Sequence, residues 1–160
     1  MRNVLREGIG LAVFIAVCFT AAGIGGIFTA SSVQDWYAHL RRPAWAPPAW
    51  LFGPVWTALY LSMALAAWLI WRGRGFSGAR GALVLFAIQL VLNAAWSPLF
   101  FGLRSPAAGF VDIVALWLAI AATTVAFYRL SLPAGVLMTP YWLWVTFAAG
   151  LNLAIWRMNA

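Results

Sequence analysis

Five long apolar stretches constrain the fold of this 160-residue chain more than any other feature. Each holds about 21–24 residues. Because a helix rises about 1.5 Å per residue, each stretch can cross a hydrocarbon core about 30 Å thick. The sequence therefore predicts an all-α integral membrane protein, a five-transmembrane-helix bundle that forms one domain over residues 1–160. The predicted helices lie at about 7–30, 48–71, 81–101, 107–129 and 134–156.

The composition supports a membrane location. Hydrophobic residues make up 65% of the chain and charged residues 8%, whereas soluble domains average about 45–50% and about 25%. All ten basic residues are arginines beside the apolar stretches, where headgroup phosphates neutralise them, so nucleic acid is not an expected partner. The arginine- and alanine-rich usage indicates a multi-pass protein of a bacterial cell membrane, inner or outer. Six arginines on one side against four on the other is too small a bias to fix the orientation.

The segment RRPAWAPPAW, residues 41–50, separates the first two apolar stretches. Proline fixes φ and lacks an N–H donor, so Pro43, Pro47 and Pro48 disfavour a helix through this segment. We predict a long structured loop at 31–47 that ends where the second helix begins. The other connections are short, which predicts that helices adjacent in sequence pack as antiparallel neighbours.

Aromatic and polar side chains recur on one face of three predicted helices. Their spacings of three or four residues place them on one side of each helix, and polar groups at membrane depth often mark a function. Gln89 and Asn93 fit an interhelical hydrogen bond and the lining of a pocket equally well, and the aromatic residues also fit ordinary packing. The faces hold Phe52, Trp56 and Tyr60; Gln89, Asn93 and Trp96; and Tyr141 and Trp144, with Asn152 two turns further on.

No motif of a known enzyme class is present. With one cysteine, Cys18, and one histidine, His39, the chain has no intrachain disulfide, no metal-binding spacing and no Ser/His/Asp set. We predict no metal site and no required cofactor. Asp112 is the only carboxylate deep in the predicted helices, near a helix start where the helix dipole stabilises it and an arginine can meet it. A proton relay would need a second buried titratable group, which the sequence does not offer.

Several motifs resemble the tryptophan-rich sensory protein (TspO) family, whose mitochondrial members are the translocator protein or peripheral-type benzodiazepine receptor. The resemblance begins at about residue 8 and runs to the C-terminus. It implies a five-helix bundle, commonly a homodimer, that binds porphyrins and other flat apolar ligands in a pocket with the first loop as its lid. The motifs are WYAHLRRPAWAPPAWLFGPVWTALY (36–60), LNAAWSPLFFG (92–102), VDIV around Asp112, ATTVAFY (122–128) and PYWLWVTFAAGLNLAIWRMN (140–159).

The resemblance also implies roles for individual residues. Trp56 and Trp144 match a tryptophan pair linked in the family to light- or oxygen-dependent porphyrin breakdown, which makes them the candidate catalytic residues. Tyr60 matches a pocket-lining tyrosine, and Asn93 and Trp96 match residues of the third helix. Arg41 and Arg42 are expected at the pocket mouth, where they could meet propionates. The predicted ligand-binding set is Trp45, Trp50, Phe52, Trp56, Tyr60, Gln89, Asn93, Trp96, Tyr141, Trp144 and Ala148.

Three functions follow as hypotheses. The first is a membrane receptor for porphyrin-type tetrapyrroles such as protoporphyrin or a haem-like ligand, with a sensing or tetrapyrrole-handling role. The others are photo-oxidative porphyrin degradation and transport of porphyrin, lipid or sterol. Leu153 replaces the tyrosine of the animal sterol-recognition segment, which disfavours a specific sterol site, although the apolar surface could accept sterols or hopanoids. Dimerisation is attributed to the third helix, with small residues at Gly78, Gly81, Ala82 and Ala87.

Overall fold

The computed structural model describes the backbone of residues 2–160 and the side chains of residues 4–160. Met1 of the predicted domain and the side chain of Arg2, one of the arginines counted above, lie outside the described part. Within it, five helices are long and apolar enough to cross a membrane, and there is no strand, which confirms the predicted fold class. The helices are α1 (Arg2–Ser32), α2 (Phe52–Gly78), α3 (Arg80–Ser97), α4 (Pro106–Leu130) and α5 (Leu132–Asn159).

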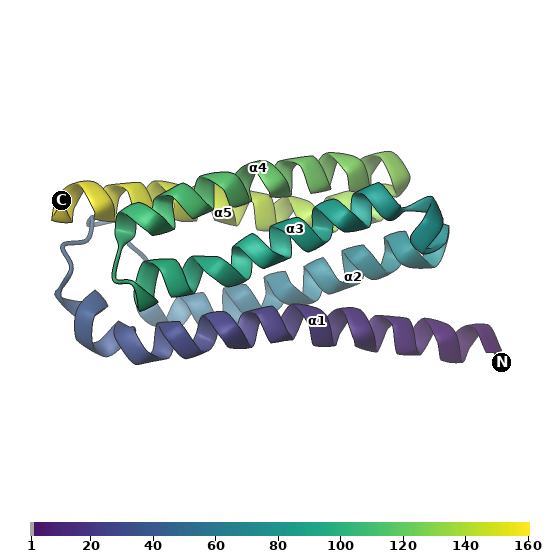
Figure 1. Ribbon diagram of the computed structural model, residues 1–160, viewed down its shortest axis with the longest axis horizontal. Helices are drawn as coiled ribbons and strands as arrows, with labels where there is room; N and C mark the ends of the chain where they lie inside the picture. The colour runs from purple at the N-terminus through teal and green to yellow at the C-terminus, as the bar shows by residue number, and fades with distance from the viewer. Residues whose placement is uncertain (1) are drawn as a thin grey trace.

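The helices form a ring in the order α1, α2, α5, α4, α3 (Figure 1). The expectation that all sequential helices are neighbours is therefore wrong for α2 and α3, which contact each other less than each contacts α1. Two glycines of α1 permit this arrangement, since a Cβ at Gly10 would collide with Trp71 of α2 and one at Gly25 would lie 3.2 Å from the Ser97 hydroxyl of α3. The short link through Ala79 therefore joins two helices that contact each other less than either contacts α1.

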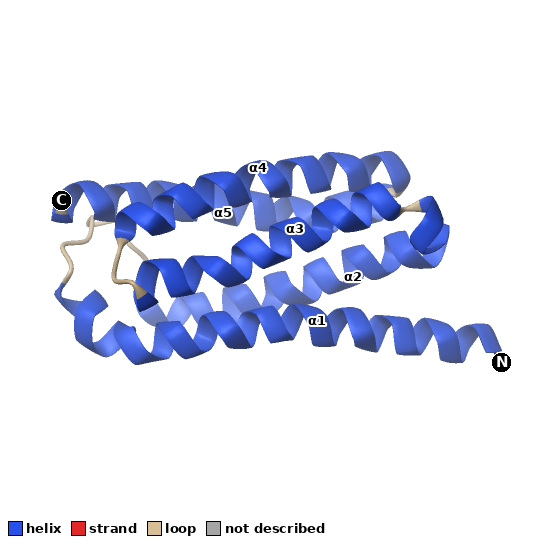
Figure 2. Ribbon diagram, in the orientation of Figure 1, coloured by secondary structure: helices blue, strands red, loops and turns tan. Residues whose placement is uncertain are grey.

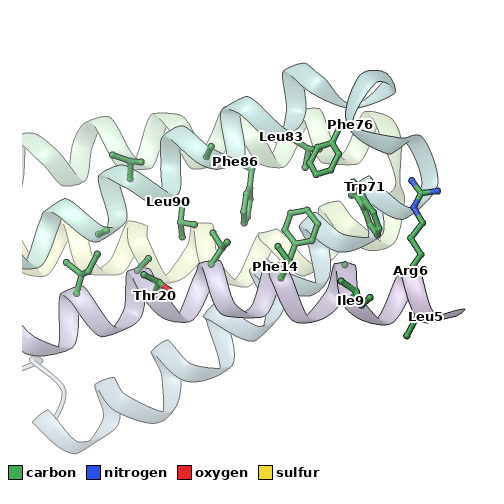
Figure 3. A pocket seen from close by; sticks show the side chains of 18 residues that line it. Leu5, Arg6, Ile9, Phe14, Thr20, Trp71, Phe76, Leu83, Phe86 and Leu90 are labelled. Carbon is green, nitrogen blue, oxygen red and sulfur yellow. The ribbon is translucent and has the colours of Figure 1, made fainter. Parts of the chain in front are cut away.

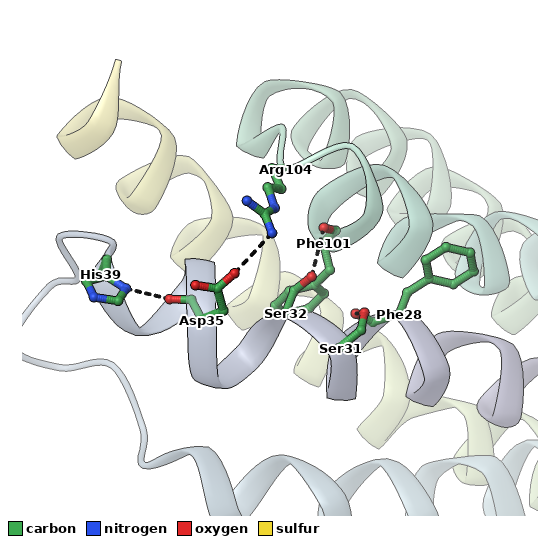
Figure 4. A network of polar contacts seen from close by, with 7 residues as sticks. All are labelled: Phe28, Ser31, Ser32, Asp35, His39, Phe101 and Arg104. Carbon is green, nitrogen blue, oxygen red and sulfur yellow. Dashed lines mark hydrogen bonds and ion pairs between the residues drawn. The ribbon is translucent and has the colours of Figure 1, made fainter.

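The first loop is shorter than predicted. Residues Val33–Tyr37 continue α1 as a π-helix, so the non-helical segment is confined to about 40–48, before a 3₁₀ turn at Ala49–Leu51 (Figure 2). The extension is stabilised because Tyr37 is buried and its ring lies 5.6 Å from that of Phe101. The Ser32 hydroxyl also donates to the Phe101 carbonyl at 3.2 Å (Figure 4). These contacts come from a distant segment, which a local reading of the sequence does not reveal.

Local sequence explains the other helix ends. The Ser105 hydroxyl accepts the Ala108 N–H at 3.2 Å and caps α4, whose first residue is Pro106. Helix α2 runs seven residues beyond its predicted end and bends at Gly75, where φ is 67°. Helix α3 passes into a π-helical turn at Pro98–Gly102. The α3–α4 turn, the first loop and the C-terminus lie at one end of the bundle, and the described start of α1 lies at the other (Figure 1).

Small side chains on α2 let the bundle close around it. Ala64, Ala66 and Ala67 are fully buried, together with Met63. A second buried cluster near the first loop is built mainly from aromatic rings, including Phe100 and Phe101. Tyr60 and Tyr141 belong to the main buried core, whereas Phe52 packs against the second cluster. The candidate site residues of α2, α3 and α5 therefore span the two clusters.

Candidate functional site

A chain of hydrogen bonds joins α2, α3 and α5 inside the bundle. The Tyr60 hydroxyl donates to Asn93 Oδ1 at 2.5 Å, Asn93 Nδ2 donates to the Tyr141 hydroxyl at 2.6 Å, and the Tyr141 hydroxyl donates to Gln89 Oε1 at 2.9 Å. All four side chains are buried. The structure thus brings four predicted residues together and confirms the interhelical hydrogen bonds, while their contact with a ligand stays a prediction. We call this set the polar network.

An aromatic row runs from the first loop into the α2–α5 interface. The ring of Trp45 lies 5.7 Å from that of Phe147, Phe147 lies 5.4 Å from Trp144, and Trp144 lies 6.0 Å from Phe52. Phe147 was not predicted, although its place three residues after Trp144 puts it on a neighbouring face of α5. The Trp144 indole N–H is buried and has no hydrogen-bond partner in the described chain. An unpartnered donor at membrane depth is costly, so this atom is suited to a ligand acceptor.

Trp56 connects the aromatic row to the polar network. Its ring lies 5.7 Å from Tyr60 and 6.3 Å from Tyr141, and it is one helical turn after Phe52 on α2. Trp56 is half-buried, and it is not among the buried indoles that lack a hydrogen-bond partner. The two candidate tryptophans therefore both face the α2–α5 interface.

Trp96 has a different environment. Its indole N–H donates to Asn152 Oδ1 at 3.1 Å, and its ring stacks on Phe100 at 4.9 Å. Asn152 in turn donates to the Pro106 carbonyl at 2.7 Å, so the contact ties α3, α4 and α5 together. The indole N–H of Trp96 already has a hydrogen-bond partner within the protein, so Trp96 packs beside the site. Its contact with a ligand stays a prediction.

The remaining predicted residues lie at the surface or near it. Trp50 is 72% exposed, and Ala148 is half-buried on α5. Arg41 and Arg42 are exposed in the first loop, and the Arg42 guanidinium lies 5.2 Å from the centroid of the Tyr37 ring. The backbone of Arg41 is held by Asn159 at the end of α5. The loop is thus fastened to α5 next to the aromatic row.

Asp112 differs from the expectation that an arginine meets it. It is buried on α4, and its Oδ2 atom has no hydrogen-bond partner in the described chain. The ion pairs among the described residues instead join Glu7 to Arg72 at 3.0 Å and Asp35 to Arg104 at 3.1 Å (Figure 4). Asp112 lies in the second turn of α4, too deep for the arginines at the helix ends to pair with it.

Two cavities lie outside the predicted set. A groove of about 850 Å³ runs between α1 and α3, and a smaller one of about 250 Å³ lies between α4 and α5 and includes Leu153. Neither is lined by a predicted site residue. The sequence signal for the first groove is an apolar residue at every fourth position of α1, at Ile9, Val13 and Val17. Figure 3 shows this groove, with Arg6 at one end near Trp71.

The sequence of the chain is similar to known proteins over nearly its whole length. The TspO/MBR family model matches residues 14–157. Tryptophan-rich protein TspO of Chlorobaculum tepidum is 45% identical over 155 residues, covering 96% of this chain and 98% of the relative. Tryptophan-rich protein TspO of Archaeoglobus fulgidus is 42% identical over 99% of both chains. The translocator protein of Homo sapiens is 41% identical over 138 residues, covering 85% of this chain and 82% of the relative.

Proposed function

The chain belongs to the TspO/MBR family, and from this premise we propose that it is a membrane receptor for porphyrin-type tetrapyrroles and other flat apolar ligands. The proposed site lies beneath the first loop, between α2 and α5, and the protein acts in a bacterial cell membrane. The tetrapyrrole is the ligand, and the proposal includes no further cofactor. Binding of the tetrapyrrole would either act as the signal that the protein senses or hold the tetrapyrrole for a later handling step.

Trp144 is the observation that carries this proposal. Its buried indole N–H lacks a partner in the described chain, and its ring packs against Phe52 of α2 and Phe147 of α5. Trp45 of the loop packs on the Phe147 ring. A flat macrocycle gains apolar burial and ring contacts against such a surface. A polar edge of the ligand could accept the indole N–H and so remove the cost of leaving it unpaired.

Binding would require the loop to move. Trp45 is 53% exposed and touches Phe147 only edge-on, so it can swing away from the aromatic row at modest cost. The macrocycle then takes its place against Trp144 and Trp56, and Tyr60 or Asn93 orients its polar edge. Arg41 and Arg42, exposed in the same loop, form charge-assisted hydrogen bonds with propionates at the mouth.

Two further partners are part of the proposal. A homodimer contact fits the outer face of α3, where Gly81, Val84 and Ile88 are exposed at helical spacing. Ala82, expected on that surface, is buried within its own bundle and takes no part. Sterols or hopanoids would be held at the α4–α5 groove beside Leu153 through apolar contact alone.

Equilibrium binding of protoporphyrin IX, followed by the fluorescence of the porphyrin, tests the proposed site. We expect Trp144→Phe to weaken binding about threefold to tenfold, from the loss of about 0.5–1.5 kcal/mol of aromatic contact and of the indole donor. Tyr60→Ala should weaken it as well. Trp142→Phe is the matched control, since Trp142 is also on α5 with an unpartnered indole N–H but packs on Trp117 of α4. Unchanged affinity in both site variants would refute the location.

A further inference from the structure

We propose that Asp112 is a proton-binding site, a neutral carboxylic acid that keeps the contact between α3, α4 and α5 closed at the first-loop end of the bundle. Helix α4 begins at that end (Figure 1). Asp112 belongs neither to the polar network nor to the aromatic row, so the site is separate from the proposed tetrapyrrole site between α2 and α5.

Asp112 is buried without a neutralising charge. It is 7% exposed, on a helix that packs mainly on α3 and α5. Every arginine whose side chain is described is exposed, and the other two acidic residues pair with Arg72 and Arg104. An ionised carboxylate here would be desolvated without a partner, and that cost is so high that a buried acid takes up a proton instead.

The groups around Asp112 offer no positive charge. The other ionisable side chains buried in the described bundle are Cys18, Tyr37, Tyr60 and Tyr141, and thiols and phenols are uncharged at neutral pH. Among them, Tyr141 of α5 is within electrostatic reach of Asp112. The buried polar residues of α3 carry only amide and hydroxyl groups. The dipole of α4 acts mainly over its first turn, whereas Asp112 lies in the second.

The hydrogen-bond donors next to this part of α4 are already engaged. A Cβ at Gly109, one turn before Asp112, would lie 3.1 Å from Asn152 Oδ1, so Asn152 lies against the same stretch of the helix. Asn152 donates to the Pro106 carbonyl, and Trp96 donates to Asn152. Asp112 Oδ2 has no partner in the described chain. A carboxylate would have to take a donor from an existing hydrogen bond, whereas a neutral carboxyl would not.

Loss of the proton would therefore break the contact around Asn152. The carboxylate would attract the amide of Asn152 or the indole N–H of Trp96, because a charge-assisted hydrogen bond is stronger than a neutral one. Either change removes a hydrogen bond that joins α3, α4 and α5. Proton occupancy of Asp112 thus sets how tightly the three helices are held together, and an alkaline medium loosens them.

A proton fits the site better than a metal ion does. A hard cation needs about six oxygen ligands. No group of three or more His, Cys, Asp or Glu that could hold a metal occurs among the described residues. The two oxygens next to this stretch of α4, Asn152 Oδ1 and the Pro106 carbonyl, already accept hydrogen bonds.

Carbon NMR of the full-length protein in detergent tests the site. Cell-free synthesis introduces aspartate labelled at the side-chain carboxyl carbon, and the chain has two aspartates, Asp35 and Asp112. Asp35→Asn assigns the two signals. We expect the Asp112 signal at the position of a protonated carboxyl at neutral pH, whereas Asp35, which pairs with Arg104, is the matched carboxylate control. An ionised Asp112 at neutral pH would overturn the proposal, and one that becomes protonated when choline replaces sodium would assign the site to a metal cation instead.

The indole N–H proton signal of Trp96 tests whether the proton controls the contact. As the pH is raised, this signal should shift together with the Asp112 carboxyl signal, and it should stay in place in Asp112→Asn, which is neutral and has the same shape. Trp68, whose indole donates to the Glu7 carbonyl between α1 and α2, is the control and should not follow Asp112.

Three results would overturn this switch. They are a Trp96 signal that does not follow Asp112, an equal shift in Asp112→Asn, and a carboxyl that does not ionise before the protein unfolds. The carbon NMR measurement needs no variant at Asp112, so it decides the proton site even if Asp112→Asn does not fold.

Discussion

The side chain of Asn159 fastens the first loop to the end of α5, and its removal should loosen the loop. Asn159 Nδ2 donates to the Arg41 carbonyl at 2.9 Å, and the Arg41 N–H donates to Asn159 Oδ1, also at 2.9 Å. The side-chain amide of Asn159 therefore pairs with both the backbone N–H and the backbone carbonyl of Arg41. The substitution Asn159→Ala deletes both hydrogen bonds to the loop, together with the one that Nδ2 donates to the Ile155 carbonyl within α5 at 2.8 Å. It leaves the aromatic contact of Trp45 with Phe147 in place.

The magnitude follows from the two hydrogen bonds. A neutral hydrogen bond contributes about 0.5–1.5 kcal/mol net, and both partners are exposed, so the lower value applies to each. The loop should lose about 1 kcal/mol of docking free energy. Since about 1.4 kcal/mol corresponds to a tenfold change, the undocked population should rise about fivefold.

Trypsin cleavage provides the assay. The enzyme cuts after arginine but not before proline, so the Arg41–Arg42 bond is the cleavable bond of this loop and the Arg42–Pro43 bond is resistant. When opening is faster than cleavage, the rate tracks the open population. We expect cleavage after Arg41 to become about fivefold faster in Asn159→Ala, and porphyrin association to speed up with it.

Two comparisons make the result decisive. Cleavage after Arg129, at the other end of the bundle, should not change, and Met158→Ala, at the preceding exposed residue, should behave as the parent protein. An unchanged rate after Arg41 in Asn159→Ala would refute the reasoning, because the loop would then be held by other contacts. An equal rise after Arg129 would show general destabilisation rather than release of the loop.

Two further predictions concern stability, measured as the free energy of unfolding in detergent. Gly109→Ala should destabilise the protein, because a Cβ there would lie 2.8 Å from the buried ring of Phe100, and such overpacking costs about 1–3 kcal/mol, more than the gain in helix propensity. Gly150→Ala, with open space around it, should stabilise the protein by up to about 1 kcal/mol. A change of the same sign in both variants would contradict the packing described. Tyr141→Phe should cost about 1 kcal/mol, because Asn93 Nδ2 and Gln89 Oε1 each lose the hydrogen bond that the Tyr141 hydroxyl makes. Tyr128→Phe at an exposed position should cost less, and the reverse order would contradict the network.

The sequence predicted the five membrane-spanning helices and which polar side chains share a helix face. Apolar length predicts membrane-spanning helices directly, and spacings of three or four residues placed Gln89 and Asn93 on one face, and Tyr141 and Trp144 on another. Those faces converge in the structure because each polar group at membrane depth needs a partner, and the partners are on neighbouring helices.

Features set by contacts between distant segments could not be read in the same way. The helical extension at Val33–Tyr37 depends on packing against Phe101, which is more than 60 residues away in sequence. The place of α1 between α2 and α3 depends on close approaches at Gly10 and Gly25, and a short connection does not exclude it. The α1–α3 groove is formed by two faces that each look merely lipid-exposed when taken alone.

The fluorine NMR spectrum of the protein labelled with 5-fluorotryptophan, recorded with and without protoporphyrin IX, tests the central claim most directly. Single Trp→Phe variants assign the signals. The proposed site predicts that the porphyrin shifts the signals of Trp56 and Trp144, which lie at the α2–α5 interface. The signals of Trp117 of α4 and Trp142 of α5, which pack on each other at the α4–α5 interface, should not change. Shifts of Trp117 and Trp142 with Trp56 and Trp144 unaffected would contradict it.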